Sequence, residues 1–386
     1  MGIVGLLLAM GLFAWKSATA SDSMEKQIDA IFAPLADANS PGQAVLVHKN
    51  GRTMFERGYG VRDLRTKTRI DAQTNFRLAS FTKQFTAMAV MLLVHDKKLR
   101  YDERLMEIFP EFPAYGKQIT LRHLLNHTSG LPDYEDLMLV AETPRSTWIW
   151  TPERQIQDDE VLRLLEKESQ GNFAPGTSWS YSNSGYVVLG LIVAKISGKP
   201  YGEFLRERIF APLKMNRTIV FQKRKTEVVN RAFGHTKEAS GFKETDQSPT
   251  SATLGDGGIY SSVEDLAKWD DALLNHTLLS ENEMKPALTP VKLTDGSDPH
   301  WPNEPGEDNL HPGQPVSYGF GWFLDPYDGH ERMWHWGSTT GFRTVIERFR
   351  NDELTVVILC NRTDLDPEKL ALQVADLIFK QQNPHP

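Results

Sequence analysis

The stretch AVLVHKNGRTMFERGY, residues 44–59, predicts an antiparallel β-hairpin. Two runs of strand-forming residues, 44–48 and 53–59, flank the pair Asn50-Gly51. This pair tolerates the positive φ angles of a type I′ turn, which joins two strands through two residues. The chain therefore enters its sheet in antiparallel fashion.

The C-terminal part of the chain predicts a second hairpin. Residues 341–349 and 354–360 are rich in β-branched and apolar side chains and are separated by a turn at Asn351-Asp352. Strands near both chain ends, with helices between them, predict one antiparallel sheet built from both ends and carrying a helical insertion. The fold class is α+β or mixed α/β.

Helical spacing of apolar residues occurs over 24–38, 367–380 and much of 121–213. Residues 81–94 are apolar nearly all round, which predicts a buried central helix. Residues 286–315 hold many prolines and predict a long surface loop, a candidate border of a functional site.

Composition narrows the possible functions. The 386 residues are enough for two or three domains, or for one large body with an insertion. The 43 Lys+Arg and 50 Asp+Glu give a net charge of −7, so nucleic acid is not an expected partner. Cys360 is the single cysteine, and it therefore allows neither an intramolecular disulfide nor a four-cysteine zinc site.

The N-terminus predicts a leader. Residues 3–15 are apolar but fewer than the about 20 that a membrane-spanning helix needs. The small-x-small pattern Ala18-Thr19-Ala20 follows, which is typical of a secretory cleavage site. We expect a signal peptide over 1–20 and an exported mature chain over 21–386. The alternative is an uncleaved membrane anchor, since no Lys or Arg precedes the apolar run.

Ser80-Phe-Thr-Lys83 opens the predicted central helix. A helix returns to the same face after three residues, so the Lys83 amine can reach the Ser80 hydroxyl. A serine needs an adjacent base to act as a nucleophile, and a desolvated lysine can serve. Ser23 and Ser240 also begin S-x-x-K patterns, but neither opens a buried helix.

Two further motifs carry polar groups suited to catalysis. Tyr181-Ser-Asn183 is the one Y-x-N among ten tyrosines, and it lies just before a helix expected to begin near Tyr186. His335-Trp-Gly337 precedes a predicted strand, where Gly337 would let a substrate approach the backbone closely. The alternative for each motif is a purely structural tyrosine or histidine.

Two other enzyme classes fit less well. His123 and His127 have the i,i+4 spacing of helical zinc ligands, but Leu124 stands where a zinc protease has glutamate, so no metal is expected. The G-x-S-x-G motif of α/β-hydrolases is absent, and the nearest string, residues 337–341, has threonine at its centre.

In this order, S-x-x-K, Y-x-N and H-x-G resemble the serine β-lactamase and penicillin-binding-protein superfamily, specifically its class C-related serine hydrolases. Further blocks also look like family signatures, and together they spread over most of the mature chain: LLNHTSGLP at 124–132, FAPG at 173–176, GGIYSSVEDLA at 257–267 and HWGSTTGF at 335–342. The resemblance implies an antiparallel sheet with helices on both faces and a helical lobe over roughly 100–250. The active site would lie at their junction.

The resemblance also implies roles for individual residues. Ser80 would be the nucleophile, and Lys83 and Tyr181 the proton-transfer pair. Asn183, His335 and Gly337 would contact the substrate. The backbone N–H groups of Ser80 and Ser338 would form the oxyanion hole.

His335 is a departure from the β-lactamase pattern, which usually has lysine there. Imidazole has an ordinary pKa of about 6.5 and is often uncharged at neutral pH, so it is a poorer partner for the carboxylate of a β-lactam. We therefore expect an enzyme of the esterase, D-aminopeptidase or DD-peptidase branch. Its ester hydrolysis should depend on pH where histidine titrates.

The sequence thus predicts an exported serine hydrolase that acts through an acyl-enzyme on an ester or peptide-like amide, without a cofactor. Its expected partner is a small-molecule or peptide substrate, and a membrane only if the leader is retained. The alternatives are a β-lactamase, a penicillin-binding or sensor module that acylates without turnover, and an inactive scaffold. The presence of Ser80, Lys83 and Tyr181 argues against the inactive scaffold.

Overall fold

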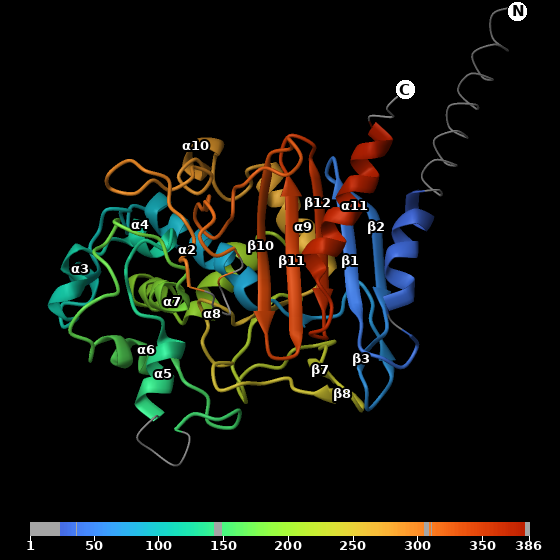
Figure 1. Ribbon diagram of the computed structural model, residues 1–386, viewed down its shortest axis with the longest axis horizontal. Coiled ribbons are helices and arrows are strands. Elements are labelled where there is room, and N and C mark those ends of the chain that lie inside the picture. The colour runs from blue at the N-terminus through green and yellow to red at the C-terminus, as the bar shows by residue number, and fades with distance from the viewer. Residues whose placement is uncertain (1–23, 36, 143–148, 305–308, 310, 383–386) are drawn as a thin grey trace, which may run out of the picture.

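A five-stranded antiparallel sheet forms one half of the computed structural model, which describes residues 24–35, 37–142, 149–304, 309 and 311–382 (Figure 1). The strand order is β10-β11-β12-β1-β2, so strands from the two chain ends meet in the middle of the sheet. The strands are β1 (Gln43–Lys49), β2 (Arg52–Tyr59), β10 (Arg332–Thr339), β11 (Phe342–Phe349) and β12 (Leu354–Cys360).

Both predicted hairpins are confirmed. Asn50 and Gly51 join β1 to β2 with φ angles of 52° and 67°, as a type I′ turn requires. The β1–β12 pairing runs in register from Gln43 opposite Cys360 to Lys49 opposite Leu354. This pairing joins the N-terminal hairpin to the C-terminal one, and the predicted sheet built from both chain ends follows from it.

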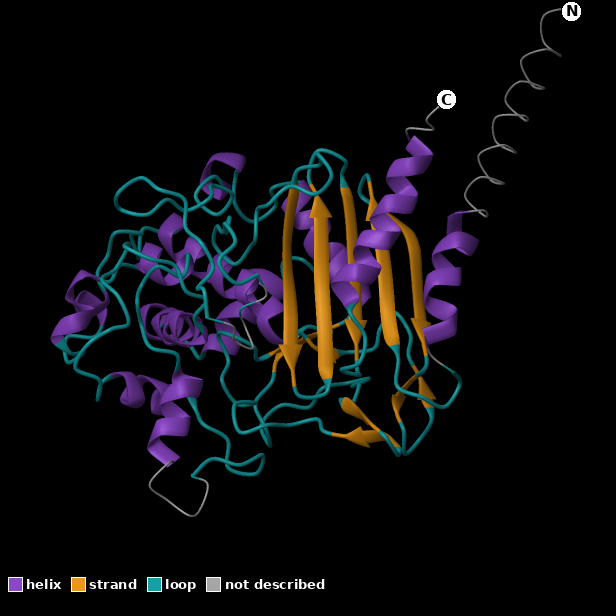
Figure 2. Cartoon of the chain, in the orientation of Figure 1, coloured by secondary structure: helices purple, strands orange, loops and turns teal. Residues whose placement is uncertain are grey.

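Helices cover both faces of the sheet, because successive side chains of a strand point to opposite faces. On one face, helix 24–32 and α11 (Pro367–Gln382) pack against alternate residues such as Val45, Val47 and Ile358 (Figure 2). The other face buries Ala44, Leu46 and Leu359 against the core that includes α2 (Lys83–His95) and α9 (Val263–Leu274).

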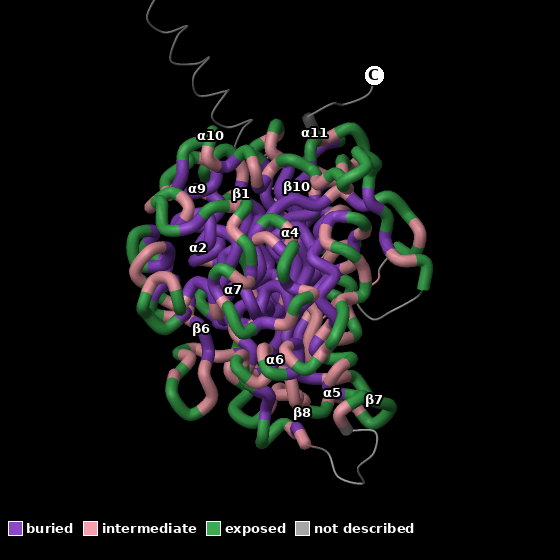
Figure 3. The backbone as a smooth tube through the Cα atoms, turned by 90° about the vertical axis from the view of Figure 1, so that its left-hand side faces the viewer, coloured by how far each residue is buried: buried purple, intermediate pink, exposed green. Residues whose placement is uncertain are grey.

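The remaining helices lie beside the sheet, on the side of β10 (Figure 1). In Figure 3 the chain around α2 and α7 is buried deep in the molecule. The helices on this side of the sheet are α3 (Leu105–Ile108), α4 (Leu121–Leu125), α5 (Tyr134–Glu142), α6 (Asp158–Leu165), α7 (Asn183–Ser197), α8 (Tyr201–Leu205) and α10 (Glu281–Met284), with a π-helical turn at Arg206–Phe210 and 3₁₀ turns at Ala79–Thr82 and Ala114–Gln118. A further 3₁₀ turn, Ala33–Leu35, continues helix 24–32.

Three small sheets accompany the five-stranded one. They contain β3 (Val61–Asp63) with β4 (Thr68–Arg69), β5 (Phe76–Arg77) with β9 (Ile259–Ser261) and β6 (Ile219–Val220), and β7 (His235–Glu238) with β8 (Gly241–Glu244). The pairing of β5 with β9 is the one that matters for the site, since β5 leads directly into the Ala79–Thr82 turn and α2.

The fold class predicted from the sequence is confirmed, and three details differ. The H-x-G motif lies inside β10 rather than before a strand. The helix expected near Tyr186 begins at Asn183, because the Ser182 side chain caps it by accepting from the Gly185 N–H at 3.1 Å. The proline-rich region is not wholly at the surface, since Trp301 is buried against Trp179.

The expected signal peptide, residues 1–20, lies outside the described residues. Within the part of the chain that the structure describes, no helix is both long enough and apolar enough to cross a membrane.

A buried polar cluster ties α9 to the sheet. The Asp270 carboxylate accepts hydrogen bonds from His48 Nδ1 at 2.7 Å, Arg348 Nε at 2.5 Å and Thr355 Oγ1 at 2.7 Å, which come from β1, β11 and β12. Burial pushes the pKa of Asp270 upward, but the bonds from His48 and Arg348 outweigh burial, and the pKa is lowered.

We expect Asp270→Asn to lower the free energy of unfolding by about 3–5 kcal/mol, because it leaves the Arg348 guanidinium buried without its anion. A carboxylate with a lowered pKa stabilises the fold above its unfolded pKa, so the difference from wild type should shrink as the pH falls below about 4. Urea unfolding at several pH values measures both effects. Glu264→Gln on the same helix, at a half-exposed ion pair, should cost at most about 1 kcal/mol. Equal losses in the two variants would contradict this assignment.

Candidate active site

Ser80 lies where the chain turns from β5 into α2. The backbone of Ala79 has a φ of 52°, a left-handed conformation that is costly for a residue with a side chain. The Leu78 N–H donates to the Ile259 carbonyl of β9 at 2.9 Å, which fixes the approach to this turn. The sharp turn leaves Ser80 half-buried at the start of the helix, facing a cavity.

Lys83 is fully buried and joins three segments of the chain. Its Nζ donates to Ser80 Oγ at 3.0 Å, to Asn183 Oδ1 at 2.8 Å and to the main-chain oxygen of Asp256 at 3.3 Å. The first bond places an amine against the predicted nucleophile, as the three-residue spacing on one helix predicts. The other two bonds hold that amine in one position.

Tyr181 lies against the same nitrogen of Lys83. The Lys83 Nζ is 4.7 Å from the centre of the Tyr181 ring, within the range of a cation–π interaction. Tyr181 also stacks on Trp336, with ring centres 5.3 Å apart, and its ring centre lies 4.5 Å from that of His127. The structure therefore brings Ser80, Lys83 and Tyr181 together.

Asn183 is positioned by the start of α7. Its N–H donates to Asp133 Oδ2 at 2.8 Å, and the preceding Ser182 N–H donates to His127 Nδ1 at 3.1 Å. These two bonds fix the Y-x-N segment against the loop that follows α4. His127 thus has a structural contact, while His123 accepts from the Thr120 N–H as part of a helix cap.

His335 is completely buried and does not line the cavity. Its Nδ1 lies 2.6 Å from the Trp336 carbonyl oxygen, so Nδ1 carries the proton, and the neutral ring accepts from the Tyr318 hydroxyl at Nε2, 3.2 Å away. Burial, and then the nearby Lys83 charge, lower the pKa of His335 to about 3. The expected titration near the ordinary histidine pKa is therefore wrong for this environment.

Gly337 allows two protein segments to meet. A Cβ on Gly337 would lie 2.0 Å from the Leu78 carbonyl oxygen and 2.3 Å from Thr344 Oγ1. In the space that a side chain would fill, Thr344 Oγ1 donates to the Leu78 carbonyl at 2.8 Å. The sequence predicted that a substrate would approach the backbone closely at Gly337. The group that approaches it is instead the backbone of Leu78, and this contact holds β10 and β11 against the turn that carries Ser80.

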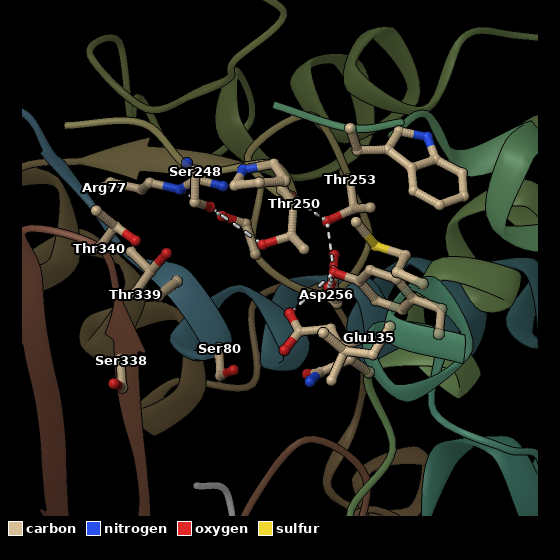
Figure 4. A pocket seen from close by; sticks show the side chains of 18 residues that line it. Arg77, Ser80, Glu135, Ser248, Thr250, Thr253, Asp256, Ser338, Thr339 and Thr340 are labelled. Carbon is tan, nitrogen blue, oxygen red and sulfur yellow. Dashed lines mark hydrogen bonds between the residues drawn. The ribbon is translucent and has the colours of Figure 1, made fainter. Parts of the chain in front are cut away.

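A cavity of about 340 Å³ opens beside Ser80, Asn183 and Ser338 (Figure 4). Asn183 belongs to α7 and Ser338 to β10, so the helical half of the molecule and the sheet both contribute to the wall of the cavity. Its other walls come from Arg77, Ala79, Tyr134, Glu135, Met138, Leu139, Trp150, Ser248, Pro249, Thr250, Thr253, Asp256, Gly257, Thr339 and Thr340. The volume suits a small substrate.

Sequence reasoning missed the charged residues of this cavity, Arg77, Glu135 and Asp256. None of them belongs to a motif with a mechanism, and Asp256 lies directly before the GGIYSSVEDLA block. No group of three or more His, Cys, Asp or Glu side chains that suits a metal ion occurs among the residues described.

Comparison with known proteins identifies relatives along nearly the whole chain. The family model described as Beta-lactamase matches residues 28–378. Penicillin-binding protein 4* of Bacillus subtilis is 29% identical over 92% of this chain and 76% of its own. A D-aminopeptidase of Gluconobacter oxydans is 26% identical over 88% of this chain, which spans only 60% of that protein's length.

Solved structures show the same architecture. The D-amino acid amidase of Ochrobactrum anthropi SV3, complexed with D-phenylalanine, is similar with a TM-score of 0.75 and 25% identity, over 93% of this chain and 99% of that one. The octameric penicillin-binding protein homologue from Pyrococcus abyssi shares the fold with a TM-score of 0.73 at 24% identity, over 94% and 77% of the two chains.

We expect Gly337→Ala to lower the free energy of unfolding by about 3 kcal/mol and to abolish ester hydrolysis, because the new Cβ forces Leu78 and the adjoining Ser80 turn away from β10. Thermal melts and a p-nitrophenyl acetate assay measure the two effects. Gly257→Ala is the matched control, since its Cβ would meet nothing closer than Ala79 at 3.7 Å. It should melt close to wild type, and a Gly337→Ala protein that does so too would contradict the account.

We also expect His335 to remain neutral from about pH 5 to about pH 8, since a lowered histidine pKa means that the proton binds only at much lower pH. The pH profile of kcat/KM for p-nitrophenyl acetate should therefore keep its shape in His335→Gln, even if its height falls. His95→Gln, at an exposed histidine of α2, is the control. A limb near pH 6.5 that disappears in His335→Gln alone would show that this imidazole titrates.

Proposed function

The chain belongs to the beta-lactamase family of serine hydrolases, and from that premise we propose that it forms an acyl-enzyme on Ser80 and hydrolyses a small ester or peptide-like amide of the D-amino-acid type. The observation that supports this most is the 3.0 Å contact between Lys83 Nζ and Ser80 Oγ at the wall of the cavity. A serine becomes nucleophilic through an adjacent base in this way.

In the proposed reaction, Ser80 Oγ attacks the substrate carbonyl carbon and its proton passes to the Lys83–Tyr181 pair. The bond from the carbonyl carbon to the leaving oxygen or nitrogen then breaks, and the leaving group takes that proton. Water attacks the resulting ester, the same pair accepts the water's proton, and Ser80 regains a proton as the acid is released. The Asn183 side-chain oxygen lies 2.8 Å from Lys83 Nζ and holds this amine beside the reacting groups.

The oxyanion of each step needs two aligned donors. We assign this role to the backbone N–H groups of Ser80 and Ser338, because both residues line the cavity on the side where β10 approaches the Ala79–Thr82 turn. Loss of one such donor typically lowers the rate by about 10²–10³.

The choice of an amide or ester over a β-lactam rests on the third motif. A neutral, buried His335 supplies no fixed cation for the carboxylate of a penicillin. The D-aminopeptidase and D-amino acid amidase relatives support the same substrate class. The similarity to penicillin-binding protein 4* favours, as a second candidate, a penicillin-binding protein that acylates without turnover.

We further propose that the protein is exported, with residues 1–20 as a cleaved leader. The apolar run over 3–15 and the small residues Ala18-Thr19-Ala20 support this proposal. A retained leader would instead anchor the hydrolase to a membrane.

Ser80→Ala is expected to abolish hydrolysis of p-nitrophenyl acetate with little change in the thermal midpoint, since no other nucleophile takes its place. Ser240→Ala, at the exposed serine of another S-x-x-K pattern, should retain full activity.

Lys83→Ala and Tyr181→Phe should each lower kcat strongly. The loss in the double variant should be far smaller than the product of the two single losses, because one proton-transfer unit fails as a whole. Additive losses would mean separate roles, and an active Ser80→Ala enzyme would refute the nucleophile.

A further inference from the structure

His127 lies in the segment that follows α4, and its backbone is strained. It belongs to the sequence block LLNHTSGLP, residues 124–132, which the structure describes throughout and which does not line the cavity beside Ser80. Its φ of 63° is the left-handed conformation, which is unfavourable for most residues with a side chain. The residue is also 1% exposed. Strain of this kind persists where the surrounding contacts require it, and the contacts of His127 lead to Tyr181.

His127 accepts hydrogen bonds from the residues on both sides of Tyr181. The Ser180 N–H donates to the main-chain oxygen of His127 at 3.1 Å. The Ser182 N–H donates to Nδ1 of the His127 ring, also at 3.1 Å. One residue therefore binds the neighbours of Tyr181 before and after it in the chain, so the backbone of Tyr181 cannot shift unless one of these bonds lengthens.

The imidazole also contacts the Tyr181 ring itself. The centres of the two rings are 4.5 Å apart. The rings of Tyr186 and Tyr318 enclose the imidazole further, with centres 5.2 Å and 4.6 Å from its own. Since the Tyr181 ring also lies 4.7 Å from Lys83 Nζ, a displacement of the imidazole would move the ring that faces the amine.

The His127 ring is neutral in these surroundings. Burial, and then the neighbouring Lys83 and His335, lower the pKa of His127 well below that of free histidine. A neutral ring can accept at Nδ1 while its proton is on Nε2, whereas a protonated ring would present a donor to the Ser182 N–H. The Nδ1 acceptor is therefore available at neutral pH.

We propose that His127 is a positioning residue for Tyr181: its Nδ1 acceptor holds the Tyr181 hydroxyl where it can exchange a proton with Lys83 and Ser80. This inference rests on the proposed function, in which Lys83 and Tyr181 move the proton of Ser80. His127 does not touch the substrate in this role. Its loss should therefore slow the proton transfer and lower kcat, while substrate binding in the cavity and hence KM change little.

The test separates the acceptor from the ring in the full-length protein. His127→Phe keeps an aromatic ring and removes the acceptor. His127→Asn keeps an acceptor, because its Oδ1 takes the place of Nδ1, and asparagine tolerates the left-handed backbone. With p-nitrophenyl acetate, His127→Phe should lower kcat at least about tenfold with little change in KM. His127→Asn should keep kcat within about threefold of wild type.

His123→Phe is the matched control. The Nδ1 of His123 also accepts from a backbone N–H, that of Thr120 at 3.2 Å, but this bond belongs to the cap of α4. The control variant should lose some thermal stability with the cap and keep the kcat of wild type. A fall in kcat as large as that of His127→Phe would mean that any disturbance of this region slows the enzyme, and would overturn the proposal.

A role through Tyr181 also fixes the outcome in a second background. In Tyr181→Phe, the further change His127→Phe should lower kcat by less than about twofold, because no hydroxyl remains to be positioned. The rate at which a fluorophosphonate labels Ser80 gives the same comparison where turnover is too slow to measure. Equal losses in both backgrounds, or no rescue by His127→Asn, would show that His127 only supports the fold and would overturn the proposal.

If His127→Phe does not fold, His127→Ala replaces it in each comparison, because it removes the acceptor without adding volume. If neither variant folds, His127 serves stability alone and the proposal is overturned. Ser80-dependent hydrolysis with an unchanged kcat in His127→Phe overturns the positioning role and leaves the proposed function standing. A wild-type protein without Ser80-dependent hydrolysis would instead refute the proposed function, and the positioning role with it.

Discussion

The buried amine of Lys83 is the group on which the proposed site depends. A polar group removed from water is tolerated only when hydrogen bonds replace its hydration, and three oxygens surround the amine here, on Ser80, Asn183 and the Asp256 backbone. These oxygens belong to the turn before α2, to α7 and to the loop before β9. The same three contacts therefore satisfy the amine, hold three distant segments together and place the amine against the serine.

The sheet contacts the turn before α2 at Gly337, where there is no side chain. Because Gly337 has no Cβ, Thr344 of β11 extends past β10 to bind the Leu78 carbonyl, two residues before Ser80. The sheet, which contains strands from both chain ends, thereby fixes the position of Ser80 relative to Ser338. Around the H-x-G motif, aromatic rings exclude water, and this exclusion is why His335 stays neutral.

The sequence-based predictions that the structure confirms rest on local patterns. The Asn50-Gly51 turn, the alternating strands and the all-apolar helix after Ser80 each depend on neighbours within a few residues, and so does the reach of Lys83 to Ser80. What the sequence does not show depends on segments that are far apart in the chain. Tyr318 helps to bury His335, and the Leu78 carbonyl is the reason that position 337 needs glycine.

The most direct test of the central claim is the intact mass of the protein after treatment with a fluorophosphonate, followed by peptide mapping. If Ser80 is activated by Lys83, one phosphonyl group should attach to the peptide that contains Ser80, and Lys83→Ala should slow its attachment at least about 100-fold, as expected when a nucleophile loses its general base. An unmodified protein, a label on any other serine, or labelling of Lys83→Ala at the wild-type rate would contradict the account.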